Sequence, residues 1–223
     1  MKDLGKLKYF LGIEVLRSQQ GIFICQKKYI LDLLVETRMI DCKPAETPMI
    51  PNQKLFMEDN VELLDKGQYQ RIAGKLIYLA HTRTDITHAV GVVSQFMHQP
   101  HVHHLEAAMR IIRYLNKAPG HGNVFRRNGH LETQIYTDAS WVGEKVNRRS
   151  TLGFFTMIEG NLLSWRSKKQ KVVSLSSAES EFREIEKEVV EALWIPKLLL
   201  KSGSHQKELL ISYAIIVKTH PNP

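Results

Sequence analysis

The sequence has few of the residues on which several classes of protein depend. Its 223 residues include two cysteines, Cys25 and Cys42, too few for a disulfide framework and at a spacing that fits no zinc pattern. The longest apolar-rich run, residues 209–217, is far shorter than the roughly 20 residues that a membrane-spanning helix needs. No apolar signal-peptide core follows Met1. These absences predict an intracellular protein, cytoplasmic or nuclear, that is not secreted and has no contact with a membrane.

Two further absences concern aspartate. No two aspartates are adjacent anywhere in the sequence, and residues 139–223 contain no aspartate at all. Enzymes that cut or extend nucleic acids with two divalent cations hold those cations about 4 Å apart with several carboxylates. After Asp138, glutamate is therefore the only acid that the chain offers for such a site.

What is present predicts a folded, basic protein. Hydrophobic residues make up 43% of the sequence and charged residues 24%, enough for a buried core in one or two domains. The chain has 31 Lys and Arg against 23 Asp and Glu. Most of the surplus lies in residues 1–130, which contain 18 basic and 12 acidic residues. A basic first half favours a polyanionic partner.

The first half of the chain reads as a hairpin followed by helices. Residues 7–15 and 21–25 have the composition of paired strands, and residues 27–39 have the apolar period of a helix. Three prolines then mark residues 43–64 as an extended linker. Further helices are predicted at residues 69–80, 85–98 and 105–117.

The third of these helices carries a basic stripe. Arg110, Arg113 and Lys117 follow one another at spacings of three and four, so they share one face of the helix. The stripe is either a solvated charged face or a surface that tracks phosphates. Arg71 and Lys75 on an earlier helix support the second interpretation.

The period changes from helical to alternating after Pro119 and Gly120. Strands are predicted near residues 131–136, 150–158 and 162–174, and an amphipathic helix at 179–201 that Pro196 kinks or stops. The overall fold class is α+β or α/β. Residues 1–50 form a hairpin and helix, 51–130 a linker and helical region, and 131–223 a mixed sheet with a covering helix.

Acidic residues stand out at two places in the second half of the chain. Asp138 ends a strand-like run in the sequence YTDASW, and a serine-rich stretch with Glu179 and Glu181 opens the predicted helix. Glu181 precedes the apolar Phe182, whereas Glu179 also suits the first turn of a helix, where carboxylates are favoured. A basic stretch with an aromatic residue lies between them and includes Arg166, Lys168 and Lys169. It is either a solvated hairpin rim or a contact for a nucleic-acid backbone.

Several stretches together resemble the Pol polyprotein of Ty1/copia-type LTR retrotransposons. They are KDLGKLKYFLGIEV at residues 2–15, YQRIAGKLIYLAHTRTDITHAVGVVSQF at 69–96, RIIRYLNK at 110–117, YTDASWVGEKVNRRSTLGFF at 136–155 and LLSWRSKKQKVVSLSSAESEF at 162–182. The resemblance implies the end of a reverse transcriptase at residues 1–50, a thumb-like and connection region, and an incomplete ribonuclease H-like domain at 131–223. Its ancestral role would be synthesis of DNA on RNA and cleavage of RNA in RNA–DNA hybrids.

The resemblance also implies site residues and partners. Asp138 matches the catalytic Asp on the first strand of the ribonuclease H domain, and Glu181, with Glu179 as the alternate, matches the helix acid. These carboxylates would bind Mg²⁺. Residues 71, 75, 110, 113, 117, 166, 168 and 169 would contact an RNA–DNA hybrid or another nucleic acid weakly. Other Pol fragments are further expected partners.

The acids that the family needs beyond these two are missing. The polymerase Tyr-x-Asp-Asp hairpin has no counterpart here. The third ribonuclease H ligand belongs to a Tyr-Cys-Asp-Asn motif, but residues 210–217 read LISYAIIV, with Tyr213 alone matching. The sequence therefore predicts a truncated Pol fragment that is inactive in both reactions. The alternative is a non-catalytic nucleic-acid-binding remnant or a decayed reading frame without function.

Overall fold

The computed structural model describes residues 5–51, 53, 55, 65–129, 132–140, 151–169, 194 and 211–215. For residues 138–140, 151–152, 168–169 and 211–215 it describes the backbone alone. The predicted helix at 179–201, with Glu179 and Glu181, lies outside the described residues, Trp194 excepted. The chain divides into two compact units, Met1–Val124 and Phe125–Pro223, and each is described by itself.

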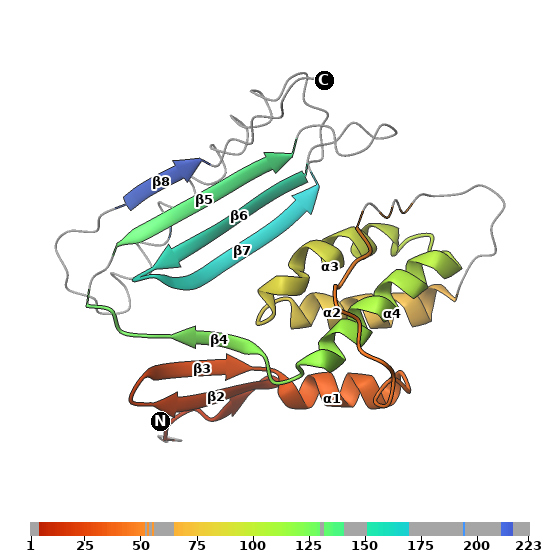
Figure 1. The fold of residues 1–223 in the computed structure, drawn as a ribbon, viewed down its shortest axis with the longest axis horizontal. Helices are drawn as coiled ribbons and strands as arrows, with labels where there is room; N and C mark the ends of the chain where they lie inside the picture. The colour runs from red at the N-terminus through yellow and green to blue at the C-terminus, as the bar shows by residue number, and fades with distance from the viewer. Residues whose placement is uncertain are drawn as a thin grey trace. The chain divides into compact units, whose positions relative to one another are not determined.

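The first unit contains a four-stranded sheet with the order β1-β2-β3-β4 (Figure 1). The strands are β1 (Tyr9–Phe10), β2 (Ile13–Ser18), β3 (Gly21–Cys25) and β4 (Gly122–Phe125). The single strand expected over residues 7–15 is in fact two, because Leu11 and Gly12 both adopt positive φ angles of 48° and 82° and reverse the chain. β1 consequently pairs with β2, with Phe10 opposite Ile13.

Within the described residues of the same unit, four α-helices pack together: α1 (Lys27–Glu36), α2 (Lys66–Leu79), α3 (Thr87–Val93) and α4 (Val102–Lys117). Their core is aliphatic and includes Leu34, Leu76 and Ile112, all fully buried. The Tyr69 hydroxyl donates a buried hydrogen bond of 2.7 Å to the Val93 carbonyl and so joins α2 to α3. The apolar period of the sequence located this core correctly.

The helix expected over residues 85–98 is shorter and is flanked by two 3-10 turns, Thr84–Ile86 and Ser94–Phe96. At its end the Ser94 hydroxyl donates to the Gly91 carbonyl at 3.0 Å. Serine side chains compete in this way with the helical backbone for its carbonyl groups. α3 therefore ends at Val93 and passes directly into the second 3-10 turn, short of the predicted end at residue 98.

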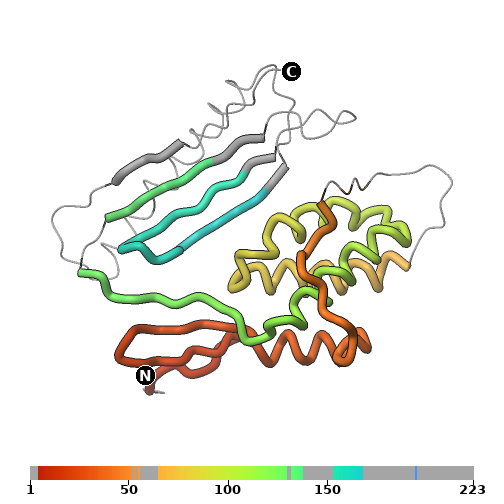
Figure 2. The backbone as a smooth tube through the Cα atoms, in the orientation of Figure 1, coloured from red at the N-terminus to blue at the C-terminus, as the bar shows by residue number. Residues whose placement is uncertain are grey.

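The segment after α1, residues 39–51, is not a free linker. The Asn116 side-chain amide on α4 donates to the carbonyls of Met39, Ile40 and Cys42 at 3.4, 3.1 and 3.3 Å. Further along, the Ala45 amide donates to the Arg113 carbonyl at 3.3 Å. The segment therefore runs along α4 from the end of that helix towards its start (Figure 2).

The second unit is built on a mixed sheet with the order β7-β6-β5-β8 (Figure 1). Its strands are β5 (Thr133–Ser140), β6 (Thr151–Ile158), β7 (Asn161–Lys169) and β8 (Ile211–Ile215). β5, β6 and β7 are antiparallel neighbours, whereas β8 lies parallel to β5. The fold is thus of mixed α and β content, with the mixed sheet that the sequence predicted in its second half.

The two faces of this sheet differ in burial. Thr133, Ile135 and Thr137 of β5 are buried and alternate with half-buried residues, as expected for a strand with one covered face. On the other face, Tyr136 lies opposite Phe155, and Phe155 lies opposite Trp165. The rings of Tyr136 and Phe155 are stacked, with centroids 4.7 Å apart. A row of three aromatic residues therefore crosses β5, β6 and β7.

Candidate functional site

Asp138 lies near the carboxyl end of the interior strand β5. Its backbone is paired with Gly153 of β6, and the parallel pairing with β8 ends one residue earlier, where Thr137 lies opposite Ile215. The carboxyl ends of parallel neighbours meet at one edge of a sheet, which is where such sheets bind ligands. The position suits a residue that binds a ligand or cation.

The described strands do not complete a two-cation site around Asp138. Gly153 has no side chain, and β8 reads ISYAI, without a carboxylate. Among the described side chains, which do not include that of Asp138, no group of three His, Cys, Asp or Glu residues could hold a metal ion. Mg²⁺ prefers oxygen ligands in near-ideal octahedral geometry. One strand carboxylate does not fit a pair of such ions, and Glu179 and Glu181 lie outside the described residues.

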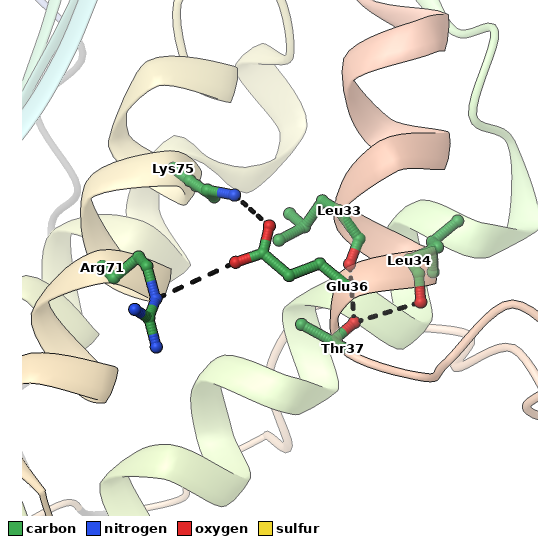
Figure 3. A network of polar contacts seen from close by, with 6 residues as sticks. All are labelled: Leu33, Leu34, Glu36, Thr37, Arg71 and Lys75. Atoms are coloured by element: carbon green, nitrogen blue, oxygen red, sulfur yellow. Dashed lines mark hydrogen bonds and ion pairs between the residues drawn. The ribbon is translucent and has the colours of Figure 1, made fainter.

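Arg71 and Lys75 are both engaged by one carboxylate (Figure 3). Lys75 forms an ion pair with Glu36 at the end of α1, and the Arg71 Nε lies 3.9 Å from the other oxygen of the same carboxylate. The next residue, Thr37, donates its hydroxyl to the Leu33 carbonyl at 2.8 Å and so fixes the end of α1. These two basic residues join α2 to α1.

Some basic residues of the α4 stripe also have partners within the chain. Lys117 forms an ion pair with Glu46, and this hydrogen bond and the lysine charge lower the pKa of the Glu46 carboxyl. Arg110 donates from Nη2 to the Thr47 hydroxyl at 3.0 Å. The Nε atoms of Arg110 and Arg113 are buried and have no hydrogen-bond partner among the described residues. The stripe thus holds the 39–51 segment, while two of its guanidinium groups keep unused donors.

Arg166, Lys168 and Lys169 lie on β7, an edge strand of the second sheet. Arg166 is exposed and lies opposite Phe154, whereas Trp165 points to the face of the aromatic row. Charged residues on an edge strand also discourage pairing with other chains. The structure brings these three basic residues together on one strand, apart in the chain from the α2 and α4 groups.

A buried ion pair in the first unit was missed by the sequence reasoning. The Arg83 guanidinium, 2% exposed, donates to both oxygens of Asp85 at 3.0 and 2.7 Å, and a further bond of 3.0 Å reaches the Ala118 carbonyl. Tyr114 donates its hydroxyl to Asp85 at 2.9 Å. Burial raises the pKa of Asp85, but the hydrogen bonds and charge of Arg83 outweigh it, so the pKa is lowered overall. The only local signal was the spacing of Arg83 and Asp85.

The histidines around the start of α4 have structural contacts. The His104 Nδ1 accepts a hydrogen bond of 3.0 Å from the His101 backbone amide, and its ring stacks on Phe96 with centroids 3.8 Å apart. A side chain that accepts from the N-cap amide is one half of a capping box. His104 therefore stabilises the start of α4.

Comparisons with known proteins identify the family. The chain is 44% identical over 203 residues to the retrovirus-related Pol polyprotein from transposon RE1 of Arabidopsis thaliana, covering 91% of this chain and 14% of that polyprotein. It is 34% identical over 220 residues to the corresponding polyprotein from transposon TNT 1-94 of Nicotiana tabacum, covering 95% and 16%. It therefore belongs to the retrovirus-related Pol polyproteins of copia-type retrotransposons.

A shorter relative matches across most of its own length. The uncharacterized mitochondrial protein AtMg00810 of Arabidopsis thaliana is 38% identical over 194 residues, which are 87% of this chain and 80% of that protein. No protein-family model and no solved structure matches the chain. In the described part of the chain, no helix is long and apolar enough to cross a membrane. The chain thus spans only a small part of the Pol polyproteins but most of this shorter protein.

Proposed function

We propose that the second unit is a ribonuclease H-like domain of a Pol polyprotein that keeps its first catalytic position without a complete metal site. The observation that carries this proposal is the place of Asp138, near the carboxyl end of β5 beside the parallel strand β8. The place of β5 between one antiparallel neighbour, β6, and one parallel neighbour, β8, supports it. The absence of an acid from β8 is the reason to expect no cleavage.

Mg²⁺ at an intact site would activate water and stabilise the leaving oxygen of the RNA strand. Asp138 with Glu181, or with Glu179 as the alternate, would supply two carboxylates. Mg²⁺ usually binds through one or two carboxylates and keeps several waters, so two acids suffice for one cation but not for the pair that the reaction uses. The chain is therefore proposed to be inactive as a ribonuclease H.

A second function is binding of nucleic acid without chemistry. The exposed Arg166 on the edge strand β7, with Lys168 and Lys169 on the same strand, favours this function. Basic residues on an accessible strand can contact the phosphates of a nucleic acid. The proposed ligand is an RNA–DNA hybrid or a single strand, bound weakly.

Cleavage of a labelled RNA–DNA hybrid tests the first proposal. Wild type and Asp138→Asn are incubated with the hybrid, with and without Mg²⁺, and the products are separated by size. We expect the two proteins to give the same result, equal to buffer alone. An active ribonuclease H added to a parallel reaction checks the substrate. Mg²⁺-dependent cleavage that Asp138→Asn removes would show that the site is complete.

A further inference from the structure

Thr47 occupies an unusual place in the sequence and in the structure. It precedes Pro48, and this is the only Ser-Pro or Thr-Pro pair among the 223 residues. Its side chain is exposed, in a stretch without helix or strand. Proline-directed kinases act on a Ser or Thr that is followed by Pro, so Thr47 has the sequence context of such a site. The residue is also accessible in the folded chain.

The Thr47 hydroxyl of the unmodified chain contacts the guanidinium group of Arg110. Arg110 Nη2 donates to it at 3.0 Å, and the hydroxyl itself donates to the Met49 carbonyl at 2.7 Å. The Arg110 Nε is buried and finds no hydrogen-bond partner in the part of the chain that the structure describes, although most buried N–H groups have one. A single hydroxyl satisfies only part of a guanidinium, which has five N–H donors.

Arg113 adds a second unused donor one turn further along the same stripe. Its Nε is likewise buried and has no hydrogen-bond partner within the described ranges, and its backbone carbonyl accepts from the amide of Ala45, two residues before Thr47. The remaining cation of the stripe, Lys117, is paired with Glu46. The positive charge beside Thr47 thus exceeds the negative charge that the 39–51 segment brings to it.

We propose that Thr47 is a phosphorylation site and that Arg110, with Arg113, binds the phosphate. The donor is ATP and the enzyme is a proline-directed serine/threonine kinase. The Thr47 Oγ1 forms a bond to the γ-phosphorus, the bond from that phosphorus to the ADP oxygen breaks, and the hydroxyl proton is released. The product carries a charge of about −1.5 to −2 and three acceptor oxygens.

The phosphate would supply the hydrogen-bond acceptors that the arginine side chains lack. Arginine binds phosphate through two parallel N–H···O bonds, so a phosphate on Thr47 gives Arg110 Nε and Nη2 a pair of acceptors. Phosphorylation removes the hydroxyl hydrogen and with it the bond to the Met49 carbonyl. That neutral bond is weaker than the charge-assisted bonds that replace it. The modified segment is therefore held more firmly on α4.

Phosphorylation of the whole chain tests the site. The protein is incubated with a proline-directed kinase and ATP, and intact mass with peptide mapping counts and locates the phosphate. We expect one phosphate, on Thr47, and none in Thr47→Val. If the kinase modifies a peptide of residues 40–54 but not the folded chain, the proposal is wrong, because the folded segment then shields Thr47.

The role of the arginines has a separate readout. The phosphorus-31 resonance, followed against pH, gives the second pKa of the phosphate, which is about 6 for a free phosphothreonine. We expect a lower pKa in wild type, a return towards about 6 in Arg110→Gln with Arg113→Gln, and no return in the control Arg71→Gln. A pKa of about 6 in every protein would overturn the arginine site. Circular dichroism confirms that each variant is folded.

Discussion

Arg83 and Asp85, two residues apart in the chain, form a bidentate ion pair. The Arg83 side chain is almost wholly buried, and the Asp85 side chain is about a quarter exposed. Tyr114 completes the pair from α4, with Arg83 Cζ 5.8 Å from its ring centroid and its hydroxyl on Asp85. The same guanidinium bonds to the Ala118 carbonyl just after α4. This pair connects the turn before α3 to the end of α4.

Replacement of Asp85 by Asn should destabilise the first unit. The change leaves the buried Arg83 charge without its partner, which costs about 3 kcal/mol of unfolding free energy in comparable pairs. The matched control is Glu36→Gln, which breaks the exposed pairs with Arg71 and Lys75 and should cost less than about 1 kcal/mol. Urea unfolding followed by far-ultraviolet circular dichroism measures both. Equal losses would contradict the assignment of the buried pair.

Tryptophan fluorescence separates the two units in these experiments. All three tryptophans, Trp141, Trp165 and Trp194, belong to the second unit. Their emission therefore originates in residues 125–223.

Acid should selectively remove the contribution of Asp85 to the free energy of unfolding. Its pKa is lowered in the folded chain, so near pH 4 the unfolded chain binds more protons at this residue than the folded one. The contribution is complete above the ordinary Asp pKa of about 3.9 and is lost as the pH falls through the lower folded value. The difference in stability between wild type and Asp85→Asn should shrink in that range. A constant difference from pH 7 to pH 2 would refute this mechanism.

Two glycine-to-alanine changes should shift the free energy of unfolding of the first unit in opposite directions. A Cβ at Gly122 would meet the Ile24 carbonyl and lie 2.8 Å from Cys25 Cβ, so Gly122→Ala should push β4 from β3 and cost about 1–3 kcal/mol. Gly74 lies in α2 and a Cβ there meets nothing within 4 Å. Gly74→Ala should stabilise the unit by up to about 1 kcal/mol, the difference in helix propensity. Thermal unfolding of both variants checks the two signs.

Binding of nucleic acid should weaken as salt rises. Each phosphate contact contributes about 0.7–0.9 to the slope of log K against log salt. Replacing Arg166, Lys168 and Lys169 together by Gln should reduce that slope by about 2. Replacing Arg71 and Lys75 should change it less, because both are occupied by Glu36. Fluorescence anisotropy of a labelled RNA–DNA hybrid measures the slopes, and an affinity independent of salt would refute the electrostatic account.

Primer extension should be absent. Polymerase chemistry needs two cations held by paired carboxylates, and the sequence contains no adjacent aspartates. A labelled primer on an RNA template, with deoxynucleotides and either Mg²⁺ or Mn²⁺, gives the measurement. Extension that a chelator abolishes would contradict the prediction.

The sequence alone determined the family, the location of the core and most of the elements. Most apolar residues at helical spacing in α1, α2 and α4 are buried, among them Leu34, Leu76 and Ile112, so this period located the core. Alternation likewise located β5 to β7. The family followed from side chains in fixed order, such as YTDASW around Asp138, which need no structure to be compared.

Only the tertiary structure decided what the charged residues contact. Arg71 and Lys75 meet Glu36, 35 or more positions away in the chain, and Lys117 meets Glu46 across a still longer interval. Helical spacing shows that basic residues share a face, but not what covers that face. The turn at Leu11 and Gly12 and the buried Arg83 escaped the sequence reasoning for a related reason. A positive φ angle and a buried charge are both tolerated only because distant residues compensate for them.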